Sequence, residues 1–200
     1  MRKYLFLTIL FCSTLVFGQN KYFELTPFGF RNATDSTKDY VVLNFPKKTK
    51  AELYKRVLVW ANKNYVTGKN VVSPVENENI TINAYGEYDD DMTKSFGEPN
   101  AVKYRINISF KDGKIKIDAP DFQLSIDNTK IGLICPKDIL KLMTHTNEKE
   151  TWCFYYEIEN ENKTSLVENK IKIQALSDFF NQRIDQIKQK IENKTTDDNW

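Results

Sequence analysis

The chain has 200 residues, of which 40% are hydrophobic, 13% are aromatic and 28% are charged. This composition is typical of an ordered globular protein and excludes the disordered and fibrous classes. The 29 basic and 27 acidic residues nearly cancel. Nucleic acids and anionic membranes select clustered positive charge, so we expect neither of them as a partner.

The N-terminus has the zones of a secretory signal peptide. Arg2 and Lys3 form a positive region, and an apolar run from Leu5 to Phe17 follows them. This run has about 13 residues, whereas a membrane-spanning helix needs roughly 20. A buried first helix of the domain is the alternative interpretation. No later segment is apolar for long enough to span a membrane.

The end of this segment fits a cleavage site. Val16 and Gly18 occupy the positions that a signal peptidase recognises, so we expect residues 1–18 to be removed and Gln19 to become the N-terminus. Cys12 lies inside the apolar run, where it does not fit a lipid-attachment site. The mature chain keeps 27 basic and 27 acidic residues. We therefore expect an exported protein, periplasmic or extracellular, that is not a lipoprotein.

A strand followed by an amphipathic helix is predicted in the first third of the chain. Residues 40–45 are mostly apolar and include two β-branched valines, and Pro46 ends this strand. Thr49 and Glu52 form a capping box, in which each side chain bonds the backbone of the other residue. The apolar stripe behind it predicts a helix over residues 50–64. The stripe contains Leu53, Val57, Trp60 and Ala61.

The middle of the chain changes to a period of two, which is typical of strands. Apolar and polar residues alternate over 80–85 and, without interruption, over 102–111. Asp112-Gly113 follows directly and favours a two-residue turn. The alternation returns over 115–126. One polar face on each strand predicts an antiparallel sheet that is covered on one side only.

The last third of the chain contains a long predicted helix. Residues 136–143 can form a short helix that starts at a proline, and residues 152–158 fit a strand better than a helical turn. Residues 165–168 have the pattern of a second capping box. The apolar positions behind it predict a helix over about 166–193. They are Ile173, Leu176, Phe180, Ile184, Ile187 and Ile191.

Cys135 and Cys153 are the two cysteines that remain after cleavage. In an oxidising compartment they can form a disulfide, which would stabilise the fold by roughly 3 kcal/mol. Two separate buried thiols are the alternative, because a thiol behaves as a small hydrophobic group. The sequence does not decide between these two states.

Four segments in a fixed order carry a family resemblance. They are Thr26-Pro27-Phe28-Gly29-Phe30, Lys38-Asp39-Tyr40-Val41-Val42, Leu53-Tyr54-Lys55-Arg56 with Trp60 and Asn64, and Phe110-Lys111-Asp112-Gly113-Lys114. Together they resemble an exported bacterial domain of unknown function that is described as having a TBP-like (TATA-binding-protein-like) fold. The resemblance covers residues 25–126, about half of the chain.

The resemblance implies an α+β domain, in which helices cover one face of an antiparallel sheet in the order strand, helix, strand meander, helix. It implies no activity, and the name of a fold does not transfer DNA binding. We expect a signal peptide at 1–18, the TBP-like domain at 19–160, and a C-terminal amphipathic helix with a tail at 161–200. The part from 130 to 160 matches no pattern of the family.

Few residues suggest chemistry. His145 is the single histidine, so any nucleophile–histidine pair depends on it, and a position at a helix end is the simpler interpretation. Asp89, Asp90 and Asp91 with Glu87 can supply oxygen ligands for Ca²⁺. Adjacent carboxylates cannot all face one ion, so a solvated loop fits better. We expect no catalytic residue, metal or cofactor.

Three functions remain as hypotheses. A non-enzymatic binding or protein-interaction module of the cell envelope is preferred, a carrier of a small apolar ligand between sheet and helix is the alternative, and a hydrolase is third. The C-terminal helix has more apolar surface than a small sheet covers. We expect Phe179, Ile187 and Ile191 to bind an envelope protein or a second copy of the chain. Core packing of the same stripe is the alternative.

Overall fold

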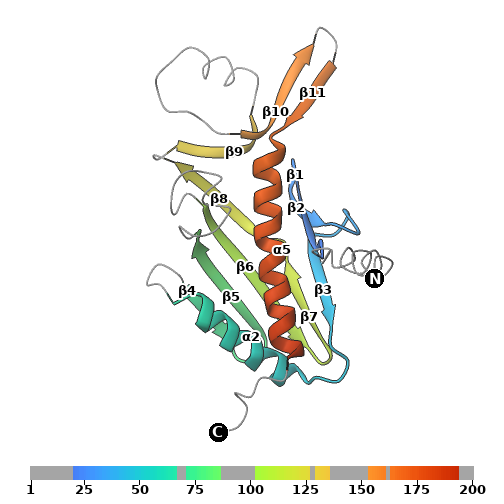
Figure 1. Cartoon of the computed structure of the whole chain (residues 1–200), viewed down its shortest axis with the longest axis vertical. Coiled ribbons are helices and arrows are strands. Elements are labelled where there is room, and N and C mark those ends of the chain that lie inside the picture. Colours follow the sequence, from blue (N-terminus) through green and yellow to red (C-terminus); the bar gives the residue numbers. More distant parts are fainter. Residues whose placement is uncertain are drawn as a thin grey trace, which may run out of the picture.

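The computed structural model describes residues 20–66, 71–86, 102–126, 129–135, 153–160 and 163–193. In these ranges two helices, α2 (Lys50–Asn64) and α5 (Lys170–Glu192), pack on one face of a large sheet (Figure 1). The protein is therefore of the α+β class, and the fold class predicted from the alternating strands is confirmed.

The longest strand, β6 (Val102–Lys111), organises the nine-stranded sheet. β5 (Asn79–Tyr85) pairs antiparallel along one edge of β6, and β4 (Val71–Val75) pairs with β5. The other edge of β6 is shared. β7 (Lys114–Asp118) pairs with its second half and β8 (Asp121–Ile126) with its first half. The predicted strand meander is present, and the sheet branches at β6.

Two branches complete the sheet. β3 (Tyr40–Asn44) pairs with β7 in one branch, and β9 (Thr129–Cys135) pairs with β8 in the other. β10 (Cys153–Asn160) then pairs with β9 in parallel, and β11 (Lys163–Glu168) forms an antiparallel hairpin with β10. The sheet is thus antiparallel except at this one pair. The connection 136–152 allows the parallel pairing, because such a crossover needs about a dozen residues.

α2 begins and ends where the sequence predicts. Thr49 Oγ1 accepts the amide hydrogen of Glu52 at 3.3 Å, and the Glu52 carboxylate accepts that of Thr49 at 2.8 Å. The Lys50 amide also donates to Asp112 Oδ1 at 2.7 Å, which ties the helix start to the β6–β7 turn. Gly113 in that turn has a φ of +72°, a conformation that glycine adopts without steric cost.

The prediction for the start of α5 is wrong. Residues 165–168 are not a capping box, because they belong to β11 and pair with β10. α5 begins at Lys170, with Asn169 as its N-cap and Asn169 Oδ1 accepting the amide hydrogen of Lys172 at 3.4 Å. Strand pairing overrides the local capping preference here, and local preference is only a weak guide when tertiary contacts compete.

The core lies between the helices and the sheet. A small second sheet, β1 (Phe23–Thr26) with β2 (Gly29–Asn32), packs beside α5 and belongs to the same core (Figure 1). Each helix contributes its apolar stripe, and β5, β6 and β7 contribute every second residue. The largest fully buried side chains are Phe23, Phe180, Leu53, Ile80, Ile82, Ile108, Ile115, Ile117, Leu176 and Ile187.

Candidate binding face

The residues that were expected to bind a partner lie in the core. The side chains of Phe179, Ile187 and Ile191 are 6%, 1% and 0% exposed, and the Phe179 ring contacts the rings of Tyr104 and Phe180. The expectation of a projecting helix assumed a small sheet. Nine strands and the β1–β2 hairpin supply enough surface to cover the stripe. These three residues therefore offer no surface to a partner in this structure.

Cys135 and Cys153 lie on neighbouring parallel strands but are not opposite each other in the register. Cys153 is opposite Gly132, whereas Cys135 is opposite Tyr156. An offset of three residues separates the two cysteines by about 10 Å along the strands, and a disulfide requires Cα atoms within about 7 Å. Their pairing stays a prediction, and it would require the backbone to shift from this register.

Other sequence-based candidates lie outside the described residues, namely the signal peptide at 1–18, the acidic run of Glu87 with residues 89–91, and His145 with the helix expected at 136–143. Among the residues that the structure does describe, no group of histidine, cysteine and acidic side chains is arranged to hold a metal ion. In the same ranges, neither helix is both long and apolar enough to cross a membrane.

A buried polar cluster joins α5 to the outer edge of β1. Asn181 Oδ1 accepts the amide hydrogens of Tyr22 and Phe23 at 3.0 and 2.8 Å, and Asn181 Nδ2 donates to the Phe23 carbonyl at 3.0 Å. Ser177 Oγ accepts the amide hydrogen of Leu25 at 3.3 Å. Buried backbone groups need such partners. These helix side chains therefore supply the hydrogen bonds that a neighbouring strand would otherwise give to the edge of β1. We interpret the cluster as structural.

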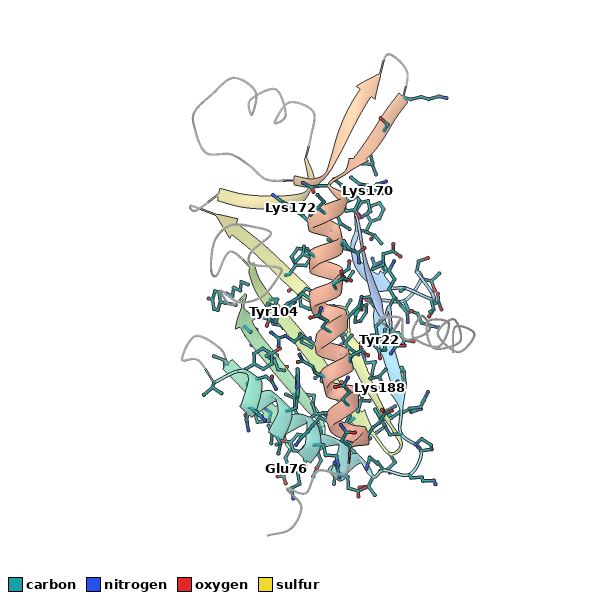
Figure 2. All side chains as sticks on the ribbon, in the orientation of Figure 1. Tyr22, Glu76, Tyr104, Lys170, Lys172 and Lys188 are labelled. Atoms are coloured by element: carbon teal, nitrogen blue, oxygen red, sulfur yellow. The ribbon has the colours of Figure 1, made fainter. Side chains whose placement is uncertain are left out.

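Two tyrosines extend this cluster. Tyr155 Oη donates to the Leu25 carbonyl at 2.8 Å, and Tyr22 Oη donates to Asp185 Oδ1 at 2.8 Å. In Figure 2, Tyr22 lies on one side of α5 and Tyr104 on the other. The phenols of Tyr155 and Tyr22 are held in their neutral form, because each donates a hydrogen bond through its Oη.

We expect the protein to lose stability between about pH 10 and 12. Burial, and then the charges of Glu168 and Glu24, raise the pKa of Tyr155 to about 12, while a tyrosine in an unfolded chain titrates near 10, about its usual value. In this window the unfolded state has released a proton that the folded state still binds, so stability falls as pH rises. The pKa of Tyr22 is raised in the same direction by burial and by Asp185.

Urea unfolding of the wild type and of Tyr155→Phe, measured from pH 9 to 12, checks this expectation. The variant should be less stable at pH 9, because it leaves the Leu25 carbonyl without its donor, but its stability should fall less steeply with pH. Tyr40→Phe, on the opposite face of the sheet, serves as the control. Parallel curves for wild type and Tyr155→Phe would show that Tyr155 does not set the alkaline limit.

The sheet has a second face, and neither described helix covers it. Side chains of β5 and β6 that alternate with the buried ones point to this side and are exposed or half-buried. We call this set the uncovered face. In β5 and β6 it contains Asn79, Thr81, Asn83, Tyr85, Lys103, Arg105, Asn107 and Ser109. Amides, hydroxyls and cations dominate it, so it is a hydrogen-bonding surface rather than an apolar one.

A hollow of about 210 Å³ lies on the uncovered face, where β5, β6 and β8 run side by side. It is lined by Asn83, Lys103, Tyr104, Arg105, Asp121 and Phe122. Strand register places Arg105 between Asn83 on β5 and Asp121 on β8. Arg105 Nε donates to Asn83 Oδ1 at 2.9 Å, and the Lys103 ammonium is 6.0 Å from the centre of the Tyr85 ring.

The lining residues of this hollow are suited to holding an acceptor group. Among the described residues that line it there is no serine, threonine, cysteine or histidine, and its one hydroxyl belongs to Tyr104. Two cations and an amide can hold an acceptor group in place. Alternation in the sequence predicted the wet face of β6, but not this hollow. Only the pairing register shows that Asn83, Arg105 and Asp121 form one row.

The protein thus belongs to the α+β class. Its two described helices cover one face of a branched sheet, and neither of them covers the polar face. Residues 40–125 match the model of a family described as a domain of unknown function, DUF4468, with a TBP-like fold. The resemblance noted in the sequence is therefore confirmed for this segment. No curated protein matches the chain.

Two crystal structures are similar in overall shape. A TBP-like protein from Parabacteroides distasonis is 13% identical, with a TM-score of 0.46, over 77% of this chain and 91% of that chain. A DUF4468 family protein from Bacteroides ovatus is 15% identical, with a TM-score of 0.47, over 78% of this chain and 86% of that chain. At these values neither structure transfers a function to this chain.

Proposed function

We propose that the protein is an exported, non-enzymatic binding module of the cell envelope, and that its ligand contacts the uncovered face of the sheet. The observation that carries the proposal is the hollow beside Arg105, where charged and amide side chains converge on rigid, paired strands. Ligand sites commonly combine a concave surface with a few placed polar groups. The expected signal peptide supports an envelope location.

The other two functions have less support. A carrier needs an enclosed apolar cavity, but the layer between helices and sheet is filled by side chains that are almost fully buried. A hydrolase commonly needs a serine, cysteine or threonine nucleophile with a base beside it, and the described residues that line the hollow include none of these three types and no histidine. We therefore propose binding without catalysis.

Site-specific photocrosslinking in living cells tests this proposal. A photoreactive residue placed at Thr81 samples the uncovered face, and the same residue at Gln182 samples the exposed side of α5. We expect a crosslinked adduct from position 81 and none from position 182, with both proteins melting as the wild type does. The same purified protein should begin at Gln19 when its N-terminus is sequenced.

Two results would contradict the proposal. Equal adducts from both positions, or adducts from position 182 alone, would mean that the uncovered face is simply solvated. An intact Met1 on protein recovered from the envelope fraction would contradict the export part of the proposal, because a secretory signal peptide is removed from the mature protein.

A further inference from the structure

The hollow on the uncovered face presents hydrogen-bond donors. Arg105 Nε donates to Asn83 Oδ1 at 2.9 Å, which engages the amide oxygen, and the amide nitrogen of Asn83 is a further donor. The two Nη groups of Arg105 only donate as well, and within the described ranges neither they nor Asn83 Nδ2 has an acceptor. The Lys103 ammonium adds a third donor.

These donors are held by the fold. Asn83 and Arg105 are direct cross-strand partners on β5 and β6, and Lys103 stands two residues before Arg105, opposite Tyr85. β6 is paired along both edges, so its backbone cannot move independently. The Arg105–Asn83 bond fixes the guanidinium further. The donors are therefore preorganised, and the site loses little conformational entropy when a ligand binds.

We propose that the hollow is an oxyanion subsite, which binds a carboxylate or phosphate group of the ligand through Arg105, Lys103 and Asn83. A carboxylate or phosphate is the matching acceptor for the two cations and the amide nitrogen, and its bonds to arginine and lysine are charge-assisted. The inference rests on the proposed function, since it names the chemistry of the ligand at the same face.

Asp121 sets the strength of the subsite. It lines the hollow and is the cross-strand neighbour of Arg105 on β8, so its carboxylate repels the anion that the other three residues attract. Its removal should therefore tighten binding. This gives two substitutions in one hollow with effects of opposite sign, which a general loss of folding cannot produce.

The test is an NMR titration of the mature protein with inorganic phosphate, glucuronate, glucose 6-phosphate and uncharged glucose. We expect the charged probes to shift the Arg105 Nε–H and Asn83 side-chain amide signals in a saturable way, and glucose to leave them unchanged. Comparison of glucuronate with glucose 6-phosphate tells a carboxylate ligand from a phosphate ligand. Arg105→Gln should weaken binding about tenfold, the effect of losing one charge-assisted pair.

Two further variants complete the design. Asp121→Asn should tighten binding about threefold, as expected for removing one nearby like charge in water. Lys116→Gln is the control, because Lys116 lies on the same face but is paired with Asp118 at 2.8 Å, and binding should not change. Absence of a saturable shift, or equal losses in Arg105→Gln and Lys116→Gln, overturns the subsite. Crosslinks from position 81 would then still support the proposed function.

Discussion

Replacement of Asn181 by leucine should lower the free energy of unfolding by at least about 3 kcal/mol. The side chain is 4% exposed, and it satisfies two backbone amides and one carbonyl at Tyr22 and Phe23. Leucine fills a similar volume but leaves the two buried groups of Phe23 and the partly buried amide of Tyr22 without these partners, and each such group costs about 1–3 kcal/mol. Urea unfolding, with both the midpoint and the slope fitted, measures the loss.

Gln182→Leu is the matched control for this experiment, because Gln182 is the exposed neighbour of Asn181 on α5. Its effect should stay within about 0.5 kcal/mol, as for most surface substitutions. Ser177→Ala removes a single acceptor from the Leu25 amide and should cost about 1 kcal/mol. If Asn181→Leu were as stable as Gln182→Leu, β1 would not depend on α5 for its edge.

The importance of Asn181 could not be predicted from the sequence. Periodicity identifies the apolar stripe of α5, but it predicts that a polar residue beside that stripe lies on the solvent-exposed side. Asn181 is buried only because the edge of β1 needs hydrogen-bond partners. That need is created by a strand about 158 positions earlier in the chain, a relation that no local pattern contains.

The two helices also show that local patterns predict an element only where no long-range pairing competes. Both ends of α2 were predicted correctly, since its capping box and stripe are local and the structure agrees with them. The start of α5 was placed too early because residues 165–168 satisfy a capping pattern and also a strand pattern. Antiparallel pairing with β10 decides between the two patterns.

The candidate site follows the same rule. The wet face of β6 was predicted from alternation alone, because side chains of a strand point to opposite faces with a period of two. The hollow was not predicted, since Asn83, Arg105 and Asp121 come from three strands whose register is set by long-range pairing. Sequence thus predicts the face on which a residue lies, whereas structure is needed to show which residues share a site.

Replacement of Trp60 by alanine should destabilise the protein by about 3–5 kcal/mol, the usual range for truncating a buried tryptophan. Trp60 lies on the inner side of α2 and is 4% exposed. Its ring meets the Tyr65 ring edge-on at a centroid distance of 5.7 Å, a contact that adds to the area it buries. Such a loss is a large part of the 5–15 kcal/mol, roughly, that stabilises a typical domain.

The companion variants show which property of Trp60 matters. Its Nε1 has no hydrogen-bond partner among the described residues, so Trp60→Phe removes an unsatisfied donor along with one ring and should cost clearly less than Trp60→Ala. Val59→Ala, at the exposed neighbour on α2, should change stability by less than about 0.5 kcal/mol. Equal melting curves for Trp60→Ala and Val59→Ala would mean that the stripe of α2 does not face the sheet. If the loss of stability is largest for Trp60→Ala, smaller for Trp60→Phe and smallest for Val59→Ala, then packing of the Trp60 ring against β5 and β6 is the source of the stability.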